Sequence, residues 1–139
     1  EITKAACEKS KRMPVTVVNY LEGTRFTPAK QAQQQSPYQN LLRPKAGGVA
    51  FVLAALGEQL DTLLDVTLVY PKGPRPGFWD LLCGRVPRVI VDIQAREIDP
   101  ALWQGDYEND SEFRQYVQNW VSRLWEQKDA RIEQLRQEF

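Results

Sequence analysis

The sequence contains no histidine among its 139 residues. Histidine is the side chain that most often serves as a general base, because its pKa lies closest to neutral pH. No other pair of nucleophile and base is apparent in the sequence. We therefore expect this chain to lack the half of an active site that moves a proton, and to contribute binding residues only.

Cysteine is scarce, and long apolar runs are missing. Cys7 and Cys83 do not have the CxxC spacing of a zinc site, and sequence alone does not show whether they form a disulfide. The default is a pair of reduced, partly buried thiols in a cytosolic compartment. The longest apolar run, 46–56, is too short to cross a bilayer. We expect no metal site and no transmembrane segment.

Net charge is also absent, since 18 basic residues balance 18 acidic ones. No global field would recruit nucleic acid, so any anion site must be local. With 139 residues, 42% of them hydrophobic, the chain can form one sizeable core but not two ordinary domains. The sequence begins with Glu1 rather than with a methionine or a signal-like segment, so we expect its start to be a processing boundary or an artificial one.

The order of apolar segments predicts an α/β fold with a mostly parallel central sheet flanked by helices. Strands are expected at 15–20, 64–70 and 86–97, with a buried helix at 49–60. A strand, a helix and a strand in this order favour a parallel βαβ unit. The long connection 21–45 is expected to lie near the substrate and to hold a short helix capped by Thr27.

Both ends of the chain are expected to be helical. A helix at 3–12 would stop before Pro14, and Asp110 or Ser111 would cap a long final helix. Trp125 does not share the face of Trp120, and 128–133 is expected to be a solvated, charged face. The apolar stripe of the final helix would comprise Phe113, Val117, Trp120, Val121, Leu124, Ile132 and Leu135.

The candidate chemistry lies in the turn Glu22-Gly23-Thr24-Arg25, directly after the first expected strand. Gly23 permits a tight or positive-φ turn, and Arg25 offers a planar fork that can bind a phosphate through two hydrogen bonds. Thr24 adds a hydroxyl donor, and Glu22 can accept a glycerol hydroxyl or hold Arg25. The alternative is an ordinary polar turn in which Glu22 and Arg25 form a surface pair of little energetic value.

The turn and three later segments together resemble a known family. The stretch 19–25 is similar to the Phe-Pro-Glu-Gly-Thr-Arg block of the glycerolipid acyltransferases, which include the 1-acylglycerol-3-phosphate acyltransferases. The stretch 41–48, Leu-Leu-Arg-Pro-Lys-Ala-Gly-Gly, follows as in the family's long-loop branch, which includes lysocardiolipin acyltransferase-like enzymes. The stretch 65–71 resembles the family's fourth block, and 120–129 resembles a late "W…L…EKD" helix.

The sequence departs from the family pattern in two ways. Tyr20-Leu21 stands where many members have Phe-Pro, and the family's His-x-x-x-x-Asp block and its second block are missing. Both blocks precede the Glu-Gly-Thr-Arg block in the family. Residues 1–139 are therefore expected to be the C-terminal portion of a single acyltransferase domain and to be inactive alone.

The resemblance implies a mechanism for the parent protein. An upstream histidine would deprotonate a lysophospholipid hydroxyl, which attacks an acyl thioester. The acceptor phosphate would dock on Arg25, with Lys45 or Lys30 as supporting cations, although either lysine could simply be solvated. No cofactor is implied, because acyl-coenzyme A or acyl carrier protein carries the donor as a substrate. The parent would associate with the cytoplasmic side of a membrane.

Further surfaces suggest partners. The segment 72–79 combines Lys72 and Arg75 with Phe78 and Trp79, which suits a bilayer surface, unless the aromatic rings cap the core. Because part of the sheet is expected to be missing, an exposed strand edge or apolar face would favour a homodimer.

Two other functional classes stay open. One is a non-catalytic phosphate-binding module, although the sequence has neither a GxxxxGK[ST] loop nor a GxGxxG motif. The other is a protein-interaction domain whose last helix docks a partner.

Overall fold

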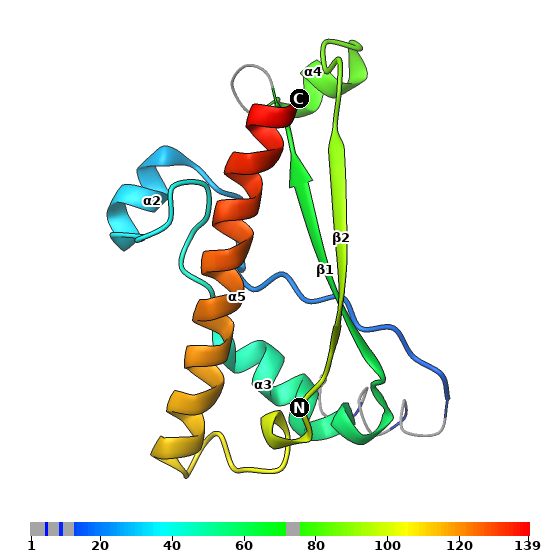
Figure 1. Cartoon of the computed structure of the whole chain (residues 1–139), viewed down its shortest axis with the longest axis vertical. Helices are drawn as coiled ribbons and strands as arrows, with labels where there is room; N and C mark the ends of the chain where they lie inside the picture. Colours follow the sequence, from blue (N-terminus) through cyan, green and yellow to red (C-terminus); the bar gives the residue numbers. More distant parts are fainter. Residues whose placement is uncertain (1–4, 6–8, 10–12, 72–75) are drawn as a thin grey trace.

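The computed structural model describes residues 5, 9, 13–71 and 76–139. The expected helix at 3–12 lies largely outside these residues, as does Cys7. Figure 1 shows a long C-terminal helix beside a two-stranded ribbon, with a shorter helix crossing near one end of both. The elements are α2 (Pro28–Gln34), α3 (Ala46–Leu56), η1 (Gly57–Gln59), β1 (Thr62–Val69), α4 (Phe78–Leu82), β2 (Ile90–Glu97), η2 (Pro100–Leu102) and α5 (Ser111–Glu138).

The sheet is antiparallel, so the prediction of a mostly parallel central sheet is wrong. β1 pairs with β2 in a register that runs from Thr62 opposite Glu97 to Val69 opposite Ile90. Two consecutive strands can pair in parallel only if a crossover connection returns the chain to the end at which the first strand began. The connection between β1 and β2 contains only the five-residue helix α4 in its described part, and the chain turns back at that point.

The segment 15–20 forms no strand, contrary to expectation. Its backbone carries no ladder to β1 or β2, and the side chains of Val18 and Tyr20 are 71% and 83% exposed. An interior strand needs a neighbour along its edge and cover on both faces. The two described strands pair with each other instead, so this segment stays single and the expected βαβ unit does not form.

The ribbon turns its polar face towards α5 and its apolar face outwards. The Lys128 ammonium lies 2.6 Å from Asp65 and donates to the Val66 carbonyl at 2.8 Å. Arg131 pairs with Asp92 at 3.0 Å, and this hydrogen bond lowers the pKa of that carboxyl group. The prediction of a solvated face at 128–133 is therefore wrong, because long-range partners bury Lys128 to 9% exposure.

Helix α5 buries one face, as its apolar spacing predicted, but the residues on that face differ from the predicted ones. Trp125 is buried and Trp120 is only half-buried against the core, which reverses the expected ranking. The Trp125 indole can be buried because its N–H donates to the Leu42 carbonyl at 3.1 Å. The buried residues of α5 follow three- and four-residue steps: Val117, Val121, Trp125, Lys128, Ile132 and Leu135.

The main core lies where α3 meets α5 and η2. Its buried members are Ala46, Val49, Leu53, Leu102 and Val121. Gly57 closes one side, because a Cβ there would lie 2.2 Å from Cγ of Trp103. Only a residue without a side chain allows Trp103 to pack over the end of α3.

Several local predictions are confirmed. The Thr27 hydroxyl caps α2 by accepting from the Lys30 N–H, with Pro28 as the first helical residue. The Asp110 carboxylate caps α5 by accepting from two amides of its first turn. Cys83 is a free thiol, but it is exposed rather than partly buried. Among the described residues, no helix is both long and apolar enough to cross a membrane.

Candidate functional site

The Glu22-Gly23-Thr24-Arg25 segment forms a tight turn after the extended segment 15–20. The Gly23 N–H donates to the Tyr20 carbonyl at 3.0 Å, which closes the turn. Gly23 adopts φ +67°, a left-handed conformation in which a side chain is strained. The expected positive-φ turn is confirmed.

Two hydrogen bonds fix the turn against the stretch that leads into α3. The Lys45 N–H donates to the Leu21 carbonyl at 2.7 Å, and the Leu42 N–H donates to Oε1 of Glu22 at 3.1 Å. Sequence reasoning offered Glu22 as an acceptor for a substrate hydroxyl or as a partner of Arg25. In the structure one of its carboxylate oxygens binds the protein backbone, so Glu22 holds two distant segments together.

Lys45 and Gly23 lie side by side at the beginning of α3. The Lys45 ammonium nitrogen is 3.5 Å from the position that a Cβ of Gly23 would occupy. Lys45 is also the N-cap residue of α3, and Gly47 and Gly48 in the first turn are exposed. The first amides of a helix lack intrahelical acceptors, and their dipoles make this end positive. The asparagine side chain of Asn19 lies against Gly48.

Thr24 and Arg25 flank a second lysine. The Lys30 ammonium donates to the Thr24 hydroxyl at 2.6 Å and to the Arg25 carbonyl at 3.3 Å. Lys45 and Lys30 were both predicted as supporting cations, and Lys30 is the one whose ammonium contacts the turn by hydrogen bonds. The Arg25 side chain is exposed, and among the described residues no hydrogen bond or ion pair of its guanidinium is seen.

The turn region therefore gathers positive charge and donors. The Lys45 side chain lies beside Gly23, and the Lys30 ammonium donates to the Thr24 hydroxyl. The Glu22 carboxylate faces the backbone of Leu42 rather than the exterior of the turn. Guanidinium, ammonium and backbone N–H groups are the donors that hold phosphate oxygens. The arrangement can hold an anion, and its only carboxylate is already engaged as an acceptor.

Residues of α5 that sequence reasoning set aside hold the site's loop in place. Asp129 accepts from the backbone N–H groups of Gln39 and Asn40 at 2.9 and 2.8 Å. The Asn40 side chain donates to Glu133 at 2.7 Å and accepts from Arg136.

Both backbone polar groups of Leu42 are bound: its N–H donates to Glu22, and its carbonyl accepts from the Trp125 indole. Helix α5 thus fixes the loop that carries Lys45. The similarity of 120–129 to a late family helix was the signal that could have marked Trp125 and Asp129.

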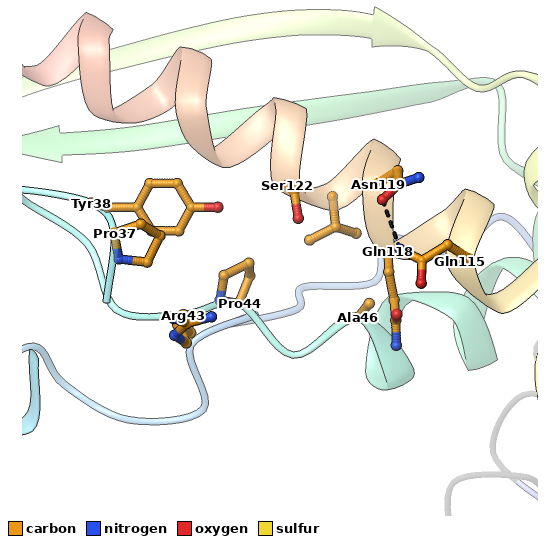
Figure 2. Close-up of a pocket in the computed structure, with 10 residues that line it drawn as sticks. Pro37, Tyr38, Arg43, Pro44, Ala46, Gln115, Gln118, Asn119 and Ser122 are labelled. Carbon is orange, nitrogen blue, oxygen red and sulfur yellow. Dashed lines mark hydrogen bonds between the residues drawn. The ribbon is translucent and has the colours of Figure 1, made fainter. Parts of the chain in front are cut away.

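A polar cleft of about 260 Å³ lies between this loop and α5 (Figure 2). Pro44 and Ala46, which flank Lys45, form part of its wall, but the four turn residues do not. Tyr38 directs its hydroxyl towards Ser122, and burial raises the pKa of this phenol. Arg43 donates to the carbonyls of Gln34 and Gln35. Since that guanidinium is engaged, the cleft is a weaker anion site than the turn.

The chain is similar to lysophospholipid acyltransferases over most of its length. It is 26% identical to 2-acyl-1-lysophosphatidylinositol acyltransferase of Saccharomyces cerevisiae, over 86% of this chain and 32% of that protein. It is 27% identical to lysocardiolipin acyltransferase 1 of Danio rerio, over 88% of this chain and 32% of that protein. The same enzyme of Gallus gallus is 25% identical over 86% of this chain and 32% of its own length. No protein-family model and no solved structure matches the chain.

These similarities confirm the resemblance that the motifs indicated. The chain spans about a third of the length of the curated relatives that it matches. The names of those relatives differ in the lysolipid on which each enzyme acts. All of the names describe acyltransferases that act on a lysophospholipid.

Proposed function

We propose that this chain is the acceptor-binding portion of an acyltransferase that transfers a fatty acyl group from a thioester to the free hydroxyl of a lysophospholipid. The observation that carries the proposal is the turn at Gly23, where Lys45 at the start of α3 lies beside Gly23 and Lys30 bonds Thr24 and the backbone of the exposed Arg25. Similarity to acyltransferases of lysophospholipids, all of which carry a phosphate, supports the assignment of this anion site.

The reaction needs a base that this sequence does not contain. The acceptor oxygen attacks the thioester carbonyl carbon, a carbon–oxygen bond forms, and the carbon–sulfur bond breaks as the thiol leaves. The proton of the acceptor hydroxyl passes to the base and then to the departing sulfur. With no histidine in 139 residues and Glu22 bonded to Leu42, we assign the base to a part of the enzyme outside this chain.

The phosphate of the acceptor would dock on Arg25, supported by Lys45 and the first amides of α3. A guanidinium binds two phosphate oxygens through parallel hydrogen bonds, whereas an ammonium acts as a point charge. Lys30 would act mainly by fixing Thr24 and the Arg25 backbone. Holding the acceptor in one orientation is itself a contribution to rate.

The substrate proposed is a lysophospholipid of the 1-acylglycerol-3-phosphate kind, because the turn resembles the Glu-Gly-Thr-Arg block of the 1-acylglycerol-3-phosphate acyltransferases and its cations can hold one phosphate. The donor would be acyl-coenzyme A or acyl carrier protein. Both thioesters, and the free thiol of Cys83, fit the cytoplasmic side of a membrane.

The proposal predicts an ordering of variants in the enzyme that contains this chain. Arg25→Ala should lower kcat/KM for lysophosphatidic acid by about 30-fold to 150-fold, which corresponds to losing about 2 to 3 kcal/mol of charge-assisted contact. Arg25→Lys should recover only part of that loss. Lys30→Ala should cost less than Arg25→Ala, since its described contacts are within the protein.

Steady-state kinetics with acyl-coenzyme A measures these effects, and Gln33→Ala on the exposed side of α2 is the control. The isolated chain, assayed in parallel, should show no turnover. Activity of Arg25→Ala equal to wild type would make the turn purely structural and would favour the non-catalytic or protein-interaction alternatives.

A further inference from the structure

Helix α4 presents large apolar side chains to solvent at the end of the β1–β2 ribbon. Phe78 and Trp79 are 66% and 71% exposed, and Leu81 and Leu82 are 60% and 61% exposed. Four of the five residues of this helix are therefore large, apolar and uncovered. The alternative that these rings cap the core is wrong.

The shape of this group limits what can cover it. Phe78, Leu81 and Leu82 are at positions i, i+3 and i+4, with Trp79 beside them, so the four apolar residues share one side of the helix and Asp80 lies on the other. Phe78 and Trp79 contact each other edge to face, with ring centroids 5.7 Å apart. Figure 1 places α4 at one end of the molecule, beside the C-terminus. A short projecting helix with one apolar side suits the boundary between lipid headgroups and acyl chains, which is where amphipathic helices bind.

The charges around α4 fit an anionic surface. Asp80, the only acidic residue of the helix, accepts from the Gly77 N–H at 2.8 Å and pairs with Arg85 at 3.5 Å. Asp80 and Arg85 thus compensate each other, and Arg88 supplies the remaining positive charge of the tip. Arg88 is exposed and lies over the ring of Phe139, 5.7 Å from its centroid. Lys72 and Arg75, which sequence reasoning grouped with the aromatic rings, lie outside the described residues.

We propose that the α4 tip, defined as Phe78, Trp79, Leu81 and Leu82 with the flanking Arg85 and Arg88, inserts into the interfacial region of an anionic lipid surface. The apolar side chains enter the boundary between headgroups and acyl chains, and Arg88 remains among the lipid phosphates. This contact adds a membrane partner to the proposed function. It depends on the α4 tip and needs no acyl transfer.

Another apolar surface provides the internal comparison. The outward face of the ribbon exposes Leu64, Val66, Leu68, Val91 and Ile93, each between 48% and 59%. In contrast to the tip, this face is a regular strand surface, and the Asp65 and Asp92 carboxylates point to the opposite side, towards α5. A strand surface of this kind suits protein cover, so it should not govern lipid binding.

Sedimentation of the chain with vesicles tests the proposal. Wild type should bind phosphatidylcholine vesicles that contain phosphatidylserine, and bind pure phosphatidylcholine less. The double variant Phe78→Ser/Trp79→Ser should weaken binding by about tenfold or more, because each ring contributes apolar area only at the interface. Leu81→Gln/Leu82→Gln should do the same and provides a second variant if the first fails to fold. Circular dichroism checks that each variant is folded.

The matched control is Val66→Ser/Ile93→Ser, a cross-strand pair on the outward face of the ribbon. It should bind vesicles as wild type does. Vesicle binding lost in this control and kept in both tip variants would overturn the proposal in favour of the ribbon face. Absence of binding to either vesicle would also overturn it. So would a tip-dependent dimer that does not bind vesicles, because α4 would then be a protein contact.

Discussion

Each residue of the turn region has its own structural role. Gly23 supplies a left-handed conformation, Glu22 binds the Leu42 backbone, and Lys45 places an ammonium group beside Gly23. Caps and turns such as Thr27, Asp110 and Gly23 were predictable because their partners are within a few residues. Lys128 was not predictable, because Asp65 and the Val66 carbonyl, which allow its burial, come from β1.

Replacing Gly23 isolates the backbone requirement of the turn. A Cβ at this position would lie 3.5 Å from the Lys45 ammonium, an ordinary contact, so the cost of Gly23→Ala should come from the positive φ. We expect the free energy of unfolding to fall by about 1 to 2 kcal/mol. Urea denaturation followed by circular dichroism measures the change.

Gly47→Ala is the control, because its added Cβ meets nothing within 4 Å and Gly47 lies inside α3. It should raise the free energy of unfolding by about 0.5 to 1 kcal/mol, as expected for alanine in a helix. If both alanine variants were equally stabilising, the left-handed turn would not exist in solution.

At the scale of elements, α5 connects the ribbon to the loop of the candidate site. One side of the helix binds β1 and β2 through Lys128 and Arg131, and Asp129 binds the backbone at Gln39 and Asn40. Helices α2, α3 and α5 were predicted near their observed positions, because helical periodicity and capping are local. Strand pairing was predicted poorly because it depends on which neighbours are available, and the apolar segment 15–20 has no partner among the two described strands.

Removing the Asp129 carboxylate should loosen the loop that carries Lys45. Asp129→Ala leaves two backbone N–H groups without their acceptor, and a hydrogen bond to a charged group contributes about 1.5 to 3 kcal/mol. We expect faster amide hydrogen exchange at 39–45 and weaker phosphate binding at the turn. Gln127→Ala, an exposed change on the same helix, should alter neither quantity. Unchanged exchange at 39–45 in Asp129→Ala would rule out this anchoring role.

At the scale of the whole molecule, the candidate phosphate site and the exposed apolar surfaces lie on different elements. Lys30 and Lys45 lie at the turn, while the outward ribbon face and the α4 tip expose apolar side chains, the tip with Arg85 and Arg88 beside it. The expected exposed apolar face is present, and the homodimer that it would favour stays a prediction. The acyltransferase resemblance was readable because motif order survives in sequence, whereas the substrate's headgroup is not encoded in these motifs.

The central claim is that the Gly23 turn holds the phosphate of the acyl acceptor, and an NMR titration of the chain with sn-glycerol 3-phosphate tests it most directly. The account predicts that amide shifts concentrate at Gly23, Thr24, Gly47 and Gly48, and that Arg25→Ala abolishes most of them while Arg85→Ala leaves them intact. Shifts confined to the cleft around Tyr38 and Ser122, or equal shifts in wild type and Arg25→Ala, would contradict it.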